Sequence, residues 1–210
     1  MKTFAILILT LLTSYSAMAA DYESVMKQTI GEMYQSQEAN KLENIAAKFF
    51  RIGETEKNKW LPYYYAAYSY VSITYHIEDG ETIDKYLDKA QQMLEKAMAL
   101  NPNESENHVL QGLIHSMRIT NPMRGMKYSA LSNEALEKAE SLNPENPRIW
   151  LCKAQNIYYT PAMFGGGAEK AKPLYKKAAD LFDTFEPQNG IWPQWGKEMV
   201  ENQLASIPEE

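Results

Sequence analysis

KAMALNP, residues 96–102, recurs as KAESLNP at residues 138–144, a shift of 42 residues. In both copies an Ala-containing helical stretch ends in Leu-Asn-Pro. Pro cannot continue a helix, and Asn tolerates the left-handed turn that often precedes it. A phrase that recurs at a fixed offset indicates a chain built from stacked copies of one small unit. The sequence therefore predicts a repeat architecture.

The apolar residues of the chain recur at intervals of three and four, as in Leu42, Ile45, Ala46 and Phe49. This spacing is typical of one-sided helices, and no comparable run of strict alternation indicates a strand. We therefore expect the all-α class, with a C-terminal helix that covers the open end of the stack. The expected helices lie at about 22–36, 38–52, 58–77, 82–100, 104–119, 127–142, 146–159, 167–184 and 192–206.

The N-terminus has the layout of a secretory signal peptide. Lys2 is followed by an apolar run from Phe4 to Leu12 and by small residues that end in Ala-Met-Ala at 17–19. The run is too short to span a bilayer, and no Cys near the cleavage site offers lipid attachment. We expect residues 1–19 to be removed and residues 20–210 to form one helical repeat domain in the periplasm or outside the cell, with no membrane span.

Composition argues against several classes of function. Removal of Lys2 from the 21 basic residues leaves 20 against 27 acidic ones, a net charge of −7, so nucleic acid is not expected as a partner. The single cysteine, Cys152, excludes an intramolecular disulfide and is expected to be an inert buried thiol.

The sequence offers little for catalysis or for a metal. His108 and His115 lie seven apart, but no HExxH motif or cysteine ligand completes a metal site. No nucleophile elbow or nucleotide loop is present. We expect no cofactor and no enzymatic activity.

Small residues stand where two helices must approach closely, seven apart in each copy, with a large residue between them. These triplets are Ala90-Leu94-Ala97, Ser132-Leu136-Ala139 and Ala171-Tyr175-Ala178. The pattern resembles the tetratricopeptide repeat from Glu38 to Phe185. The resemblance implies a right-handed α-solenoid of antiparallel helix pairs, about four pairs and a cap. Chaperone-tail binding is not implied, because the corresponding slots hold mainly Tyr, Val and Leu instead of Lys, Arg and Asn.

The repeat is longer than the usual 34 residues, and we expect the excess in the turn between the two helices of each unit. Two such turns, residues 120–125 and 160–165, share the pattern T-x-x-M-x-G. A gap-filling role for the methionines is one interpretation. The other is a ligand-facing rim that includes Met123, Met163 and Phe164.

In solenoids of this family the first helix of each pair lines a concave groove. The residues that the resemblance places there are Tyr64, Tyr68, Leu113, Met117, Gln155, Tyr158 and Tyr159. The Tyr-rich stretch 63–70 is equally compatible with a core role. Two functions follow: binding of a protein or peptide in an aromatic groove, or binding and delivery of a small apolar ligand, as in transporter-associated repeat proteins. An open groove favours the first and an enclosed channel the second.

Overall fold

The computed structural model describes residues 22–208. The predicted signal peptide and its cleavage site lie outside these residues. All regular elements in the described part of the chain are helices, and it contains no strand. Within it, no helix combines the length and the hydropathy that a membrane span needs.

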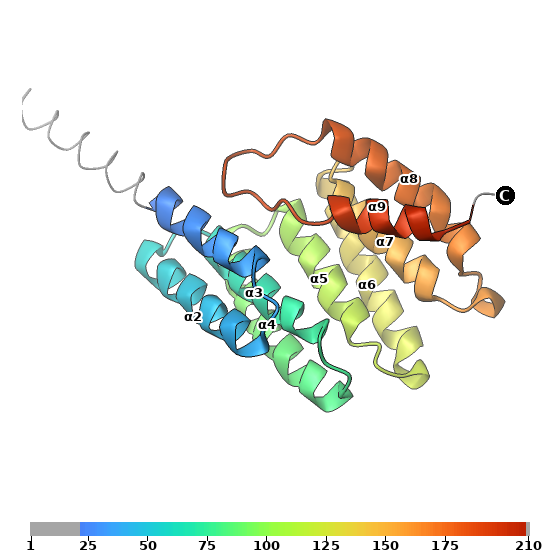
Figure 1. Ribbon diagram of the computed structural model, residues 1–210, viewed down its shortest axis with the longest axis horizontal. Helices are drawn as coiled ribbons and strands as arrows, with labels where there is room; N and C mark the ends of the chain where they lie inside the picture. Colours follow the sequence, from blue (N-terminus) through green and yellow to red (C-terminus); the bar gives the residue numbers. More distant parts are fainter. Residues whose placement is uncertain (1–21, 209–210) are drawn as a thin grey trace, which may run out of the picture.

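The chain begins with a helical segment, residues 22–34, and continues with helices of 10 to 21 residues. The elements are α2 (Ala39–Glu56), α3 (Leu61–Thr74), α4 (Gly80–Leu100), α5 (Ser105–Met117), α6 (Pro122–Leu142), α7 (Pro147–Tyr159), the 3-10 helix η1 (Ala162–Phe164), α8 (Ala168–Thr184) and α9 (Lys197–Ser206). Successive helices pack as antiparallel pairs, and the pairs stack into the predicted α-solenoid (Figure 1).

The small residues predicted at the helix crossings are all buried. The three triplets named above, small residues and the large residues between them, have no solvent exposure. At Gly112 a Cβ atom would lie 2.8 Å from the Leu136 side chain, so glycine is needed for the close approach of α5 to α6. This confirms the packing pattern from which the repeat was recognised.

The Asn-Pro phrases end their helices in a different conformation from the one expected. Asn101 and Asn143, which follow α4 and α6, have φ values of −144° and −153° instead of the left-handed turn. A residue before proline is driven toward extended backbone by the proline ring, which explains the difference. At the other ends of helices, the side chains of Asp79 and Asn121 accept hydrogen bonds from backbone N–H groups of the first turn.

The prediction of a lengthened turn at residues 120–125 is wrong, because most of these residues are helical. Helix α6 starts at Pro122, five residues before the expected position, so Met123 and Gly125 belong to its first turn. In the corresponding place, residues 160–167 form a true loop that contains η1, with Gly165 at φ 85°. The extra length of the α5–α6 repeat therefore lies in helix α6. The extra length of the α7–α8 repeat lies in the loop between its two helices.

The C-terminal helix is also shorter than predicted, because Trp192 and Trp195 lie in an irregular segment, residues 185–196. This segment leaves the end of α8 and runs back across the stack before α9 begins (Figure 1). Trp195 stacks on Tyr68 with ring centroids 5.1 Å apart, and its Nε1 donates to the Tyr64 hydroxyl at 2.8 Å. The C-terminal segment is thus joined to α3 by a contact between residues 131 positions apart.

Candidate ligand-binding site

The expected aromatic groove is partly covered in the structure. Tyr64, Tyr68 and Leu113 are 0%, 7% and 3% exposed, and Trp195 lies on the two tyrosines. Tyr64 and Tyr68 therefore pack in the core, as one of the two interpretations of the Tyr-rich stretch proposes. They are not presented on an open surface, and their role in binding stays a prediction.

The other expected groove residues remain accessible. Met117, Gln155 and Tyr158 are partly buried, and Tyr159 is 75% exposed. Met117 is the last residue of α5 and Tyr159 the last residue of α7.

A third residue, Tyr75, completes a row with Met117 and Tyr159. It follows α3 directly, as its C-cap, and is 45% exposed. The three residues are spaced by 42 positions, and each stands at the C-terminal end of its helix, α3, α5 or α7. Helices α3, α5 and α7 follow one another in the stack (Figure 1). We call Tyr75, Met117 and Tyr159 the Tyr–Met row. The interval of the repeated phrase, counted back from Met117, would have identified Tyr75.

Protein surrounds the Tyr75 hydroxyl, although the Tyr75 side chain is 45% exposed. Burial is the main cause that raises the pKa of Tyr75, followed by the neighbouring Cys152 thiol and the Tyr159 hydroxyl. A hydroxyl that is nearly half exposed yet desolvated is surrounded by protein on several sides. The pKa of Tyr175 on α8 is also raised, mainly by burial and then by the neighbouring Tyr159 hydroxyl. The phenol groups of Tyr75 and Tyr175 therefore remain neutral at physiological pH.

Exposed apolar side chains flank the row on the adjacent turns. Met163 and Phe164 of η1 are 83% and 73% exposed, and Met123 and Met126 of α6 are 95% and 89% exposed. A Cβ atom at Gly166 would overlap the Thr160 carbonyl, so the loop after α7 folds tightly and holds η1 outward. The predicted rim residues Met123, Met163 and Phe164 are thus accessible, and the interpretation that the two methionines fill gaps in the core is wrong.

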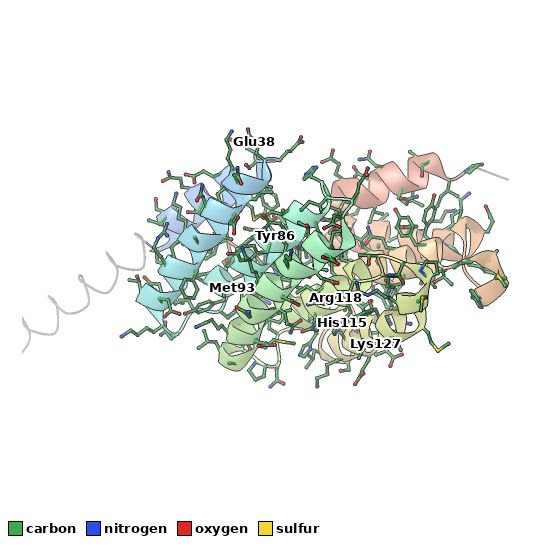
Figure 2. The ribbon with its side chains drawn as sticks, turned by 90° about the horizontal axis from the view of Figure 1, so that it is seen from below. Glu38, Tyr86, Met93, His115, Arg118 and Lys127 are labelled. Atoms are coloured by element: carbon green, nitrogen blue, oxygen red, sulfur yellow. The ribbon has the colours of Figure 1, made fainter. Side chains whose placement is uncertain are left out.

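Two of the three histidines, His108 and His115, make contacts within the fold, and His76 is exposed. His115, labelled beside Arg118 in Figure 2, contacts Gln111 and stacks on Tyr128 with ring centroids 6.4 Å apart. Burial, and then the Arg118 charge, lowers its pKa. His108 contacts the Pro102 carbonyl. Among residues 22–208 no group of three or more His, Cys, Asp or Glu side chains is arranged to hold a metal ion.

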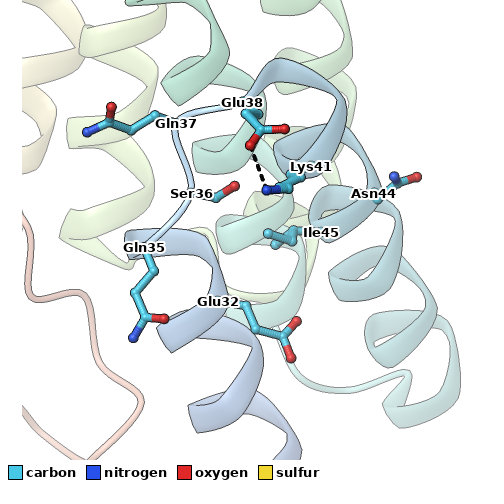
Figure 3. Close-up of a pocket in the computed structure, with 8 residues that line it drawn as sticks. All are labelled: Glu32, Gln35, Ser36, Gln37, Glu38, Lys41, Asn44 and Ile45. Carbon is cyan, nitrogen blue, oxygen red and sulfur yellow. Dashed lines mark hydrogen bonds and ion pairs between the residues drawn. The ribbon is translucent and has the colours of Figure 1, made fainter.

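A cavity of about 430 Å³ lies between the first helical segment and α2 (Figure 3). Its lining is almost entirely polar and includes the Glu38–Lys41 ion pair, with 2.6 Å between carboxylate oxygen and ammonium nitrogen. Such a lining is poorly suited to an apolar ligand. The Tyr–Met row and its flanking methionines offer the more suitable surface.

Solved structures resemble the chain over most of its length. The HusA haemophore from Porphyromonas gingivalis is 30% identical, with 90% of this chain and 96% of the haemophore covered and a TM-score of 0.79. A thermophilic TPR protein from Thermus thermophilus is 18% identical over 93% of this chain and 95% of its own, with a TM-score of 0.54. The second likeness concerns the fold alone and confirms a TPR-like helical repeat. No family model and no curated protein matches the chain.

Proposed function

The chain belongs to the family of the HusA haemophore, and we propose that it is a non-catalytic protein that binds haem outside the cytoplasm. The observation that carries this proposal is the 30% identity to that haemophore over nearly the whole of both chains. Of the two functions expected from the sequence, this favours the small apolar ligand. The predicted signal sequence at residues 1–19 supports the location.

The Tyr–Met row is the surface that we assign to the haem. A porphyrin is a flat, largely apolar ring, and flat rings are bound by aromatic faces and by polarizable thioethers. Tyr75 and Tyr159 supply the aromatic faces, and Met117 between them supplies a thioether at the equivalent place of the middle repeat. Met163 and Phe164, on the loop after Tyr159, extend the apolar surface beside the row.

Tyrosine, methionine and histidine are the residue types among these helices that ligate haem iron. The raised pKa of Tyr75 opposes formation of a phenolate in the free protein. His115 packs against Gln111 and Tyr128. His76, which is exposed directly after Tyr75, and Met117 are the residues beside or within the row that could ligate the iron. Contact with the porphyrin ring is expected to supply the rest of the affinity.

The test is a titration of the mature chain, residues 20–210, with haemin, followed by the haem absorbance. The double variant Tyr75→Ala/Tyr159→Ala removes two ring contacts of about 0.5–1.5 kcal/mol each, so its affinity should fall by at least about fivefold. Leu100→Ala is a matched control, because Leu100 is 41% exposed at the other end of α4. Equal affinities for the double variant and the control would refute the assignment of the row.

A second candidate function, binding of a protein or peptide partner, is favoured by the exposed side chains of Met123 and Met126. Singly exposed apolar residues are ordinary, but two methionines about nine-tenths exposed on one helical turn are typical of interaction surfaces. A photo-crosslinking residue at Met123 should capture a partner in cells, and the same residue at Leu100 should not. Equal crosslinking at both positions would contradict this second function.

A further inference from the structure

A second cavity, of about 300 Å³, lies away from the Tyr–Met row, between α5, α7 and the segment that follows α8. It is lined by eleven residues, among them Glu104, Glu106, Glu145, Asn146, Glu186 and Trp192. Four of these residues are glutamates, and none is Lys, Arg or His. Glu106 is paired with Arg148 behind the cavity wall, and the other three glutamates have no cation among the lining residues.

Glu106 gives this cavity a buried carboxylate that is only half satisfied. The residue is 1% exposed, and its Oε1 accepts hydrogen bonds from Arg148 and Asn146, each at 3.0 Å. Its Oε2 is buried and has no hydrogen-bond partner among the described residues. A buried carboxylate oxygen without a donor is costly, and a donor placed in the cavity would recover that cost.

The surroundings of Glu106 strengthen the negative field. Glu104 lines the same cavity, as do the exposed carboxylates of Glu145 and Glu186. Helix α8 ends at Thr184 with no basic residue in its last turn, so the negative end of the helix lies at the cavity wall without a compensating charge. Arg148, the cation paired with Glu106, is fully buried and donates its other hydrogen bond to the Pro193 carbonyl.

The geometry points to this cavity as a binding site for an organic cation, namely a guanidinium or primary ammonium group. Such a group carries several N–H donors, which match the free Oε2 of Glu106 and the open carboxylates of Glu145 and Glu186. Trp192 adds an aromatic wall, which favours a cation that also has apolar parts. A bare metal ion fits less well, because these carboxylates are not arranged as a metal-binding group. The cation can come from a free polyamine or from an Arg or Lys side chain of a partner protein.

The test uses the mature chain and the indole N–H signal of Trp192 in NMR spectra. We expect titration with L-argininamide or with spermidine to shift this signal in a saturable way. The double variant Glu145→Gln/Glu186→Gln changes two exposed residues, so it should fold, and it should weaken binding at least about threefold. The control, Glu169→Gln/Glu201→Gln, removes the same charge from positions outside the cavity and should bind like the wild type.

The outcomes separate the two sources of the cation. Saturation by spermidine alone identifies a free polyamine, and saturation by L-argininamide identifies the side chain of a partner. A shift that does not saturate, an equal loss in both double variants, or the same shift with MgCl₂ would overturn the proposal. Haemin binding to the Glu145→Gln/Glu186→Gln variant should be unchanged, so the haem proposal and the cation proposal can fail separately.

Discussion

The buried ion pair between Arg148 and Glu106 is the point at which the C-terminal segment is fixed to the repeats. Arg148 is fully buried, and its Nη1 donates to Glu106 Oε1 at 3.0 Å while Nη2 donates to the Pro193 carbonyl. Its guanidinium also lies over the Phe185 ring, 4.8 Å from the centroid. One side chain therefore connects α5, α7 and the segment of residues 185–196.

Arg148→Met should reduce the free energy of unfolding by about 3–5 kcal/mol, the usual cost of leaving one member of a buried pair without its partner. The substitution keeps much of the side-chain volume, so the cost comes from the stranded Glu106 carboxylate and the Pro193 carbonyl. Adding Glu106→Gln removes the stranded charge, and the double variant should recover about 1–2 kcal/mol. Urea unfolding, followed by circular dichroism, measures both differences.

The pH dependence of the stability lost in Arg148→Met tests whether the stranded Glu106 carboxylate causes the loss. Burial raises the pKa of Glu106, and Arg148 opposes that rise, so Arg148→Met should raise this pKa further. A carboxyl group with a higher pKa in the folded than in the unfolded state binds more protons when folded, so stability falls as pH rises through that interval. The variant should therefore lose less stability at about pH 5 than at about pH 7. A loss below about 1 kcal/mol, or one independent of pH, would refute a buried charged pair.

Three further results are expected. Gly112→Ala should destabilise the protein by about 1–3 kcal/mol because its Cβ would overlap Leu136, whereas Gly125→Ala, which meets no atom within 4 Å, should raise stability by up to about 1 kcal/mol; thermal unfolding of the two variants measures both. Cys152 should resist Ellman's reagent at about pH 8 until the protein is unfolded, because burial raises the pKa of its thiol to about 12 and the thiolate is the reactive form. Rapid reaction of native protein would contradict that burial. Trp195→Ala should cost about 3–5 kcal/mol in urea unfolding and increase the exposure of Tyr68 to solvent, and a loss below about 1 kcal/mol would show that residues 185–196 do not dock as described.

Much of the fold follows from spacing in the sequence. Ala90 and Ala97, or Ser132 and Ala139, predict close helix contacts because only small side chains allow them, and all four are buried. The start of α6 could not be located in this way. Gly125 was interpreted as part of a turn, but Pro122 at the first position of a helix with Asn121 as its cap is an equally good helix start.

The site was less predictable, because it depends on what covers each face. The sequence places Tyr64 and Tyr68 on the same side of the stack as Tyr159, and nothing local indicates that Trp195 lies over the first two only. The contact with Tyr64 joins residues 131 positions apart, and periodicity carries no information about such distant pairs. The segment 192–196 was expected to be helical because its tryptophans suit an apolar stripe, but their partners on α3 and just before it hold it in irregular backbone.

The most direct test of haem binding at the Tyr–Met row is a methyl NMR spectrum of the mature chain, with ¹³C-labelled methionines, recorded with and without haemin. The ring current and iron of a bound haem displace nearby methyl signals strongly. We predict the largest changes at Met117 and Met163, and little change at Met26 and Met93, which pack in or against the core away from the row. Unchanged spectra, or the largest changes at Met26 or Met93, would contradict the account.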